Sequence, residues 1–173
     1  MNTSELNHLS TKWIESLVID EINMDESGIV NFNDHIDTAL NLEDSSIEMM
    51  DQLREHFEIF VTKFNDLRND TDKTIKLFKI SNTINDFLLF RNSLKLVISR
   101  SSNETITIGF MNNSGNFFST RNSDGQSVPQ IYHELKAMVG AFNNIKWTYQ
   151  GDPVEINSLV KFYLSEFIKQ SAS

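Results

Sequence analysis

Residues 94–111 read LKLVISRSSNETITIGFM, and this stretch decides the fold class. Apolar residues occupy every second position on each side of the polar link at 101–104, and a period of two residues is typical of a β-strand. The alternating apolar positions are Leu94, Leu96, Ile98, Ile106, Ile108 and Phe110. Because such a short link joins antiparallel neighbours, the stretch predicts a hairpin of two strands, over residues 94–100 and 105–111.

The same alternation continues on both sides of this pair. It predicts further strands over residues 74–80, 86–91, 116–120 and 145–149. The strands up to residue 120 are joined by short polar links, and glycine in the link at 112–115 supplies the positive φ of a tight turn. Residues 121–126 then form a loop that leaves the sheet. Successive strands with short links predict an antiparallel meander.

The period changes to that of a helix over residues 46–68. Ser45 or Ser46 is the expected N-cap, and Glu48 completes a capping box. The apolar residues of this helix step by three and four: Met50, Leu53, Phe57, Phe60, Phe64 and Leu67. Such a stripe is either a seam between two copies of the chain or the face that a helix packs on a sheet. We favour packing on the sheet, because flanking apolar residues widen the stripe beyond a coiled-coil seam.

We predict three more helices, over residues 10–20, 127–140 and 152–169. The second and third each open with a polar cap, Ser127 and Asp152. A proline follows each cap within two residues, and the first turn of a helix tolerates proline because its N–H groups have no partner there.

Together these elements predict an α+β fold. N-terminal helices are followed by an antiparallel β-meander, and then by a helix, a strand and a helix packed on one face of the sheet. We expect a single domain over residues 1–173. Within it, residues 1–70 form an acidic, mainly helical N-terminal subdomain, and residues 71–173 form the antiparallel sheet with two helices.

The composition argues against several classes of protein. The 173 residues include no Cys, which excludes a disulfide scaffold, a Cys-ligated metal site and a cysteine nucleophile. The net charge of −9 argues against a nucleic-acid partner, because phosphate contacts require a positive surface. The sequence shows neither a secretory signal nor an apolar run of about 18 residues, the length that spans a membrane. We therefore expect a cytoplasmic protein without a membrane partner.

The excess of negative over positive charge lies entirely in the N-terminal part of the chain. Residues 1–70 hold 16 acidic and 4 basic residues, whereas residues 71–173 hold 8 acidic and 11 basic residues. The acidic part is either a solvated face that keeps the protein soluble or a surface that docks on a basic partner. In the second case the partner is another protein or the basic second half of a sister chain, which would make a homodimer.

Residues 23–34, NMDESGIVNFND, resemble the twelve-residue calcium loop of EF-hand proteins. The resemblance implies a Ca²⁺ site with oxygen ligands at loop positions 1, 3, 5, 9 and 12, since a hard cation takes six to eight oxygens. These ligands would be Asn23, Asp25, Ser27, Asn31 and Asp34. Gly28 would supply the sharp turn, and Val30 the apolar position. The pattern departs from the family in its first residue, Asn instead of Asp, and its last, Asp instead of Glu.

A hairpin explains the same residues without a metal. Ile22 and Met24 would lie on one strand, and Val30 and Phe32 on the next. Residues 25–28 would form a type I turn closed by a left-handed glycine.

The sequence contains no recognisable catalytic set, and we therefore expect a protein that is not an enzyme and that uses no cofactor unless it binds Ca²⁺. The favoured function is protein–protein binding, as an adaptor, an immunity or inhibitor protein, or a secretion chaperone. The first alternative is a calcium-binding module that uses residues 23–34. The second is an enzyme or small-ligand-binding protein with a pocket between sheet and helices. The residues of that pocket would be Arg91, Arg100, Tyr132, His133 and Trp147.

Overall fold

The computed structural model of the chain describes residues 11–30, 37–111, 119–121, 127–129 and 132–172. The chain divides into two compact units, Met1–Asp37 and Thr38–Ser173. Helix α1 (Lys12–Ser27) belongs to the first unit, and all other described helices and strands belong to the second.

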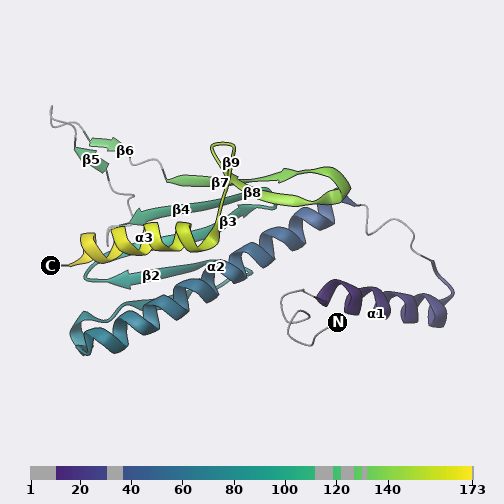
Figure 1. Cartoon of the computed structure of the whole chain (residues 1–173), viewed down its shortest axis with the longest axis horizontal. Coiled ribbons are helices and arrows are strands. Elements are labelled where there is room, and N and C mark those ends of the chain that lie inside the picture. Colours follow the sequence, from purple (N-terminus) through teal and green to yellow (C-terminus); the bar gives the residue numbers. More distant parts are fainter. Residues whose placement is uncertain (1–10, 31–36, 112–118, 122–126, 130–131, 173) are drawn as a thin grey trace, which may run out of the picture. The chain divides into compact units, whose positions relative to one another are not determined.

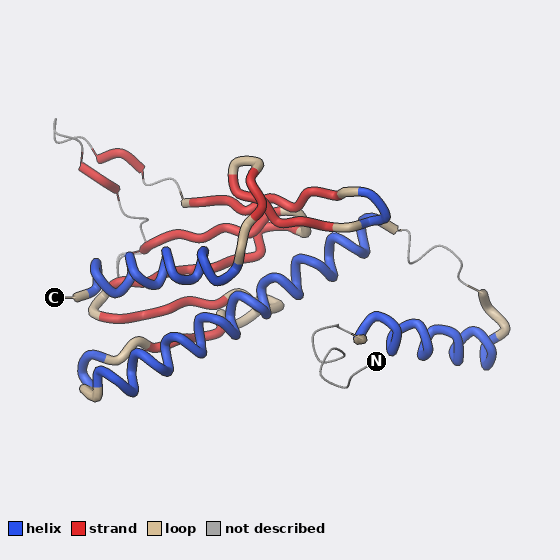
Figure 2. Tube along the Cα trace, viewed as in Figure 1, coloured by secondary structure: helices blue, strands red, loops and turns tan. Residues whose placement is uncertain are grey.

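The second unit contains a seven-stranded antiparallel sheet, with helices α2 and α3 on one of its faces (Figures 1 and 2). The strand order is β1-β2-β3-β4-β7-β8-β9, and β5 pairs with β6 in a separate two-stranded sheet. The strands are β1 (Lys76–Lys79), β2 (Phe87–Arg91), β3 (Leu94–Ser102), β4 (Thr105–Met111), β5 (Ser119–Arg121), β6 (Ser127–Pro129), β7 (His133–Val139), β8 (Ile145–Tyr149) and β9 (Asp152–Pro153). The helices are α2 (Thr38–Arg68) and α3 (Ile156–Ser171), with short 3₁₀ turns η3 (Thr71–Lys73) and η4 (Ala141–Asn143).

This arrangement confirms the predicted α+β fold with an antiparallel meander. Strands β1 to β4 and β8 lie where the alternation places them, and the polar link at 101–104 is the β3–β4 turn. The predicted link at 112–115, with Gly115, lies outside the described residues. The loop predicted over 121–126 begins instead with the last residue of β5, and its remaining residues also lie outside them.

Helix α2 begins two turns earlier than predicted, at Thr38. Ser45 and Ser46 therefore lie inside the helix, and the prediction that one of them is the N-cap was wrong. Leu42 is 7% exposed and extends the buried face of the helix toward its N-terminus. Burial in the added turns stabilises the helix on the N-terminal side of the two serines, since tertiary packing outweighs local capping preference.

The predicted apolar stripe of α2 is correct in its first half and at Phe64, which is half-buried against the core, but it is wrong at Phe60 and Leu67. Met50, Leu53 and Phe57 are fully buried, but Phe60 is 42% and Leu67 74% exposed. Other members of the buried face are Leu42, Ser46, Met49 and Val61. After Leu53 the buried positions are spaced by four residues. A straight helix has 3.6 residues per turn, so side chains that follow an alternating repeat of three and four gradually rotate away from the sheet.

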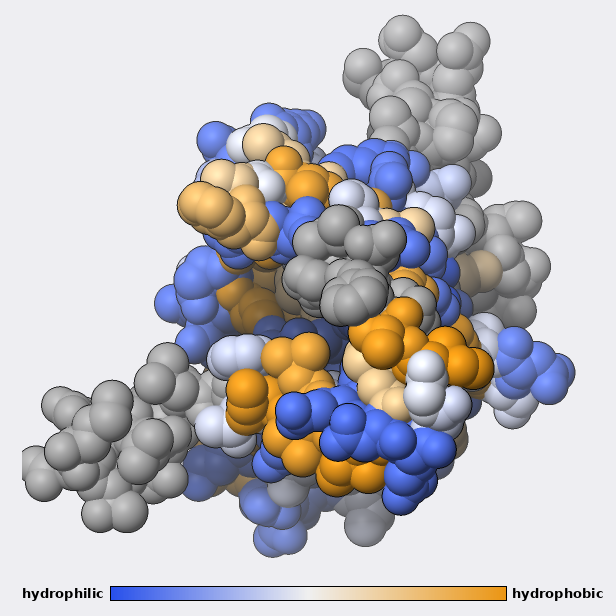
Figure 3. All heavy atoms as spheres, turned by 90° about the vertical axis from the view of Figure 1, so that its right-hand side faces the viewer, coloured by the Kyte–Doolittle hydropathy of each residue, from blue (hydrophilic) through white to orange (hydrophobic). Residues whose placement is uncertain are grey.

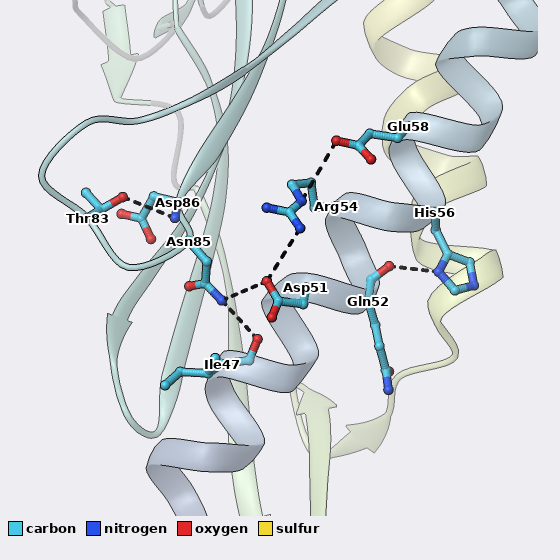
Figure 4. Close-up of polar contacts among 9 residues, drawn as sticks. All are labelled: Ile47, Asp51, Gln52, Arg54, His56, Glu58, Thr83, Asn85 and Asp86. Carbon is cyan, nitrogen blue, oxygen red and sulfur yellow. Dashed lines mark hydrogen bonds and ion pairs between the residues drawn. The ribbon is translucent and has the colours of Figure 1, made fainter. Parts of the chain in front are cut away.

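One hydrophobic core lies between the two helices and the sheet. It joins buried residues of α2, α3 and strands β2, β3, β4, β7 and β8. Phe57 of α2 meets Phe87 of β2 edge to face, with ring centroids 5.9 Å apart. Polar contacts fix the same helix on the sheet: the Asn85 amide, in the loop before β2, points toward α2 and donates to the Ile47 carbonyl at 2.9 Å (Figure 4).

The helix predicted over residues 127–140 does not form. Ser127–Pro129 is strand β6 and His133–Val139 is strand β7. Leu135 fits the helical period of 3.6 residues, and it also fits the strand period of two, because charged residues flank it on both sides. Strand β7 pairs with β4 on one side and β8 on the other, and this pairing buries Leu135 to 2% exposure. Sheet pairing therefore overrides the local helix signal.

Helix α3 forms as predicted near the C-terminus, but its cap is not Asp152. Asp152 and Pro153 form the short strand β9, and Glu155 is the N-cap. The Glu155 carboxylate accepts the backbone N–H groups of Asn157 at 2.9 Å and Ser158 at 2.7 Å. The buried side of the helix contains Leu159, Val160, Tyr163, Leu164 and Phe167.

The cap predicts a pH dependence of folding. Hydrogen bonds from Ser158, and then from Asn157, lower the pKa of Glu155 below its ordinary value of 4.5. A lowered carboxyl pKa contributes stability above pH 4.5 that is lost as the pH falls through the folded-state pKa. We expect Glu155→Gln to lower the free energy of unfolding at pH 7, and the difference from the wild type to shrink as the pH falls below 4.5 and through the folded-state pKa. Urea titrations over a series of acidic pH values measure it, and a difference that does not change with pH would contradict the role of the carboxylate.

Helix α1 extends beyond its predicted end at residue 20 and includes Ile22 and Met24. The alternative hairpin over residues 22–32 was therefore wrong in its first strand. Gly28 ends the helix in the left-handed region, with φ at 66°, and its N–H donates to the Met24 carbonyl at 2.9 Å. The positive φ expected of Gly28 is thus used in a helix C-cap.

Among the described residues, no helix has both the length and the apolar character needed to cross a membrane.

Candidate binding face of the sheet

The two faces of the sheet differ in what covers them. Side chains alternate between the faces along a strand, and in β2 Phe87 and Leu89 are buried while Leu88 and Phe90 are half-buried. The buried set packs against α2 and α3 in the core. The opposite set lies on the face that these helices do not cover (Figure 1). We call this second face the open face.

Strand register aligns apolar side chains in a row across the open face. Phe78 of β1 pairs with Leu88 of β2, and Leu88 pairs with Val97 of β3. Gly109 of β4 continues the row without a side chain. Phe78 is 48% exposed, and Leu88 and Val97 are half-buried by their neighbours on the sheet. The row is therefore an apolar surface that water reaches.

The neighbouring row combines apolar and cationic side chains. Lys76 pairs with Phe90, Phe90 with Lys95, and Lys95 with Met111. Neither lysine forms an ion pair within the described part of the chain. Aromatic and aliphatic surface beside free ammonium groups is suited to an apolar ligand that carries negative charge.

Further along, the open face becomes polar. Ser99, Thr107 and Glu134 form the next row. Lys136 of β7 lies 3.1 Å from the Glu134 carboxylate and donates to the Thr105 hydroxyl at 3.0 Å. The carboxylate on this part of the face is therefore already paired with a lysine. The charged groups of the two apolar rows, which have no such partner, are lysines.

Helix α1 exposes an apolar stripe of its own. None of its residues is buried, and Trp13 is 64% exposed. The stripe follows steps of three and four residues: Trp13, Ile14, Leu17, Val18 and Ile22. At about 100° per residue, Glu21 and Asp25 lie on the same side of the helix as the stripe. This helix thus combines an apolar surface with carboxylates.

A third apolar group lies at the turn between β7 and β8. Met138, Val139 and Phe142 are 54%, 46% and 103% exposed. Phe142 lies in the left-handed region with φ at 56°, which costs a bulky residue about 1–2 kcal/mol. Figure 3 shows hydrophobic groups bordered by hydrophilic residues on the face of the molecule that it draws.

Most residues of the predicted pocket have structural partners. Arg100 donates to the Ser46 hydroxyl at 3.1 Å, and the Trp147 indole donates to Ser45 at 3.1 Å. These two thus reach adjacent residues of α2 and fix that helix on the sheet. Tyr132 is 40% exposed, just before β7.

Arg91 lies near the C-terminus of α3. It is 5% exposed, donates to the Ser171 hydroxyl at 3.4 Å and lies 5.3 Å from the ring centre of Phe64. Burial lowers the pKa of the guanidinium, and the charge of Arg68 lowers it further. The helix C-terminus compensates part of the buried positive charge.

His133 belongs to an aromatic cluster with Tyr149 and Tyr163. Its ring lies 5.0 Å from Tyr149 and 5.7 Å from Tyr163, centroid to centroid, and its Nδ1 is hydrogen-bonded to the Tyr163 hydroxyl. Burial raises the pKa of Tyr163 above its ordinary value, and Tyr149 adds to the shift, so the hydroxyl remains protonated at neutral pH. The cluster fixes α3 against β7 and β8.

The predicted calcium ligands lie partly in α1. Asn23, Asp25 and Ser27 are in its last turns, and at about 100° per residue Asp25 lies on the side of the helix opposite the other two. Asn31 and Asp34 lie outside the described residues. Within the described ranges no three His, Asp or Glu side chains gather into a metal-binding group. The five-ligand site therefore stays a prediction.

The open face was not predicted from the sequence, although a signal was present. Residues 87–90 and 96–98 are unbroken apolar runs, FLLF and LVI. A half-buried strand alternates, whereas an unbroken run indicates apolar side chains on both faces.

No family model, curated protein or solved structure matches this chain.

Proposed function

We propose that the protein acts by protein–protein binding and that the open face is its binding surface. The observation that carries this proposal is the pair of rows on β1 to β4, in which Phe78, Leu88 and Val97 adjoin Lys76 and Lys95. Apolar side chains on a sheet face gain free energy when a partner removes them from water, about 25 cal/mol for each Å².

The chemistry of the face defines its partner. Lysine ammonium groups beside apolar side chains favour a segment whose apolar side also bears carboxylates. The strands lie about 4.8 Å apart, so four of them span about 15–19 Å, which matches an amphipathic helix of about three turns. The partner is therefore an acidic amphipathic helix. This function requires neither a catalytic group nor a cofactor.

A peptide titration tests the proposal on the full-length chain. The probe is a fluorescent peptide with the sequence of residues 10–30, and the receptor carries Leu17→Gln and Ile22→Gln so that its own helix does not compete. We expect saturable binding that weakens as salt increases. Adding Leu88→Glu should weaken binding at least tenfold, about 1.4 kcal/mol, because it places a carboxylate in the apolar row.

Two further variants serve as controls. Lys95→Glu should also weaken binding of the peptide. It tests the face at a half-buried charged position, in case Leu88→Glu unfolds the sheet. Thr62→Glu adds the same charge on the exposed side of α2 and should leave binding unchanged. Equal binding by the receptor and by both face variants would rule out the open face as the binding surface.

A further inference from the structure

We infer that the helix received by the open face is α1 of a second copy of this chain, so that two chains exchange their N-terminal helices in a homodimer. This inference rests on the proposed function of the open face. It adds the identity of the partner.

Helix α1 has the chemistry that the face requires. Its stripe contains Trp13, Leu17 and Ile22, none of which is buried within the described residues of the unit Met1–Asp37, and Glu21 and Asp25 lie on the same side. The open face offers Lys76 and Lys95 beside its apolar rows. Each surface thus offers apolar area to the other, and the carboxylates among the apolar residues of α1 complement the lysines among the apolar residues of the open face.

The charge of the whole chain favours the same pairing. By the two compact units, residues 1–37, which carry α1, hold 8 acidic and 1 basic residue, whereas residues 38–173, which carry the sheet, hold 16 acidic and 14 basic residues. Most of the net charge of −9 therefore lies in the unit that carries α1. The strongly acidic unit of one copy meets the nearly balanced unit of the other, at a face where Lys76 and Lys95 form no ion pair within the described residues.

The contact area favours a reciprocal exchange. A helix of 16 residues is about 24 Å long and about 10 Å wide, and docking it removes roughly 500 Å² from water over both surfaces. That is small for a specific complex. Two such contacts in one dimer bury roughly 1,000 Å², which reaches the area expected of a biological interface. The residues between α1 and α2, 28–37, can extend over about 33–36 Å.

A mixing experiment tests the exchange on full-length chains. The helix variant carries Leu17→Gln and Ile22→Gln, and the face variant carries Leu88→Glu. Light scattering coupled to size exclusion should show a dimer for the wild type and monomers for each variant alone. An equimolar mixture should form a heterodimer, because the helix of the face variant can dock on the sheet of the helix variant. This heterodimer keeps one of the two contacts, so we expect its dissociation constant to be at least tenfold higher than that of the wild-type dimer.

Matched variants separate this result from unfolding. Ser16→Gln on the polar side of α1 and Thr62→Glu on α2 should leave the dimer intact, and Lys95→Glu should weaken it at least tenfold. A wild type that is monomeric at 100 times the peptide dissociation constant would overturn the exchange, as would a mixture that stays monomeric. In either case, binding of the 10–30 peptide to the open face would show that the proposed function holds without an exchange of helices between two copies.

Discussion

Replacing Phe57 by Ala is expected to lower the free energy of unfolding by about 3–5 kcal/mol, the largest loss that we predict for a single side chain. Phe57 is fully buried in the centre of α2 and meets Phe87 of β2 edge to face. Truncation removes apolar area from the core and leaves a cavity that the helix and the sheet cannot close without moving together. Urea denaturation followed by circular dichroism measures the change.

Phe60, one turn further along α2, is the matched control. It belongs to the same sequence stripe but is 42% exposed. Phe60→Ala should therefore cost about 1 kcal/mol or less. Equal losses at the two positions would mean that α2 presents a different side to the sheet.

Replacing Asn65 by Ala is expected to cost about 2–4 kcal/mol. The Asn65 amide donates to the Ile75 carbonyl at 2.9 Å, and its oxygen accepts the Ile75 N–H at 2.9 Å. This pair joins the last turns of α2 to the residue before β1. Ile75 is 2% exposed, so truncation leaves two backbone groups with neither protein nor water as a partner, at about 1–3 kcal/mol each.

The same denaturation assay tests this prediction. Asp66→Ala, at the next and exposed position, should change the free energy of unfolding by about 0.5 kcal/mol or less. Asn65→Asp keeps the acceptor and loses the donor, and it should be at least as destabilising as the loss of one hydrogen bond. A loss below 1 kcal/mol for Asn65→Ala would contradict the described connection between α2 and β1.

The sheet was predictable because its signal is local. In residues 94–111 every second side chain is apolar, and the β3–β4 hairpin follows from that pattern and a short link. The helix predicted over 127–140 failed because Leu135 suits two periods, and only its pairing with β4 and β8 decides between them. The prediction that Ser45 caps the helix failed because a distant contact decides its role. Its hydroxyl accepts a hydrogen bond from Trp147, 102 residues away in the sequence.

The candidate site depends on information that a single strand does not contain. Phe78, Leu88 and Val97 form a row only through the registers of β1 with β2 and of β2 with β3. The sequence did indicate an acidic first part and a basic second part, and the hypothesis of a sister chain as partner came from it. The structure adds the positions of the lysines on the open face and of the exposed stripe on α1.

The most direct test of the open face as a binding surface is a methyl spectrum of the full-length chain labelled at Leu and Val. We compare the wild type with the chain carrying Leu17→Gln and Ile22→Gln. The account predicts that the resonances of Leu88 and Val97 differ between the two chains, whereas those of Val160 and Leu164, on the buried side of α3, stay in place. Unchanged resonances of Leu88 and Val97 at concentrations where the wild type is dimeric would contradict it.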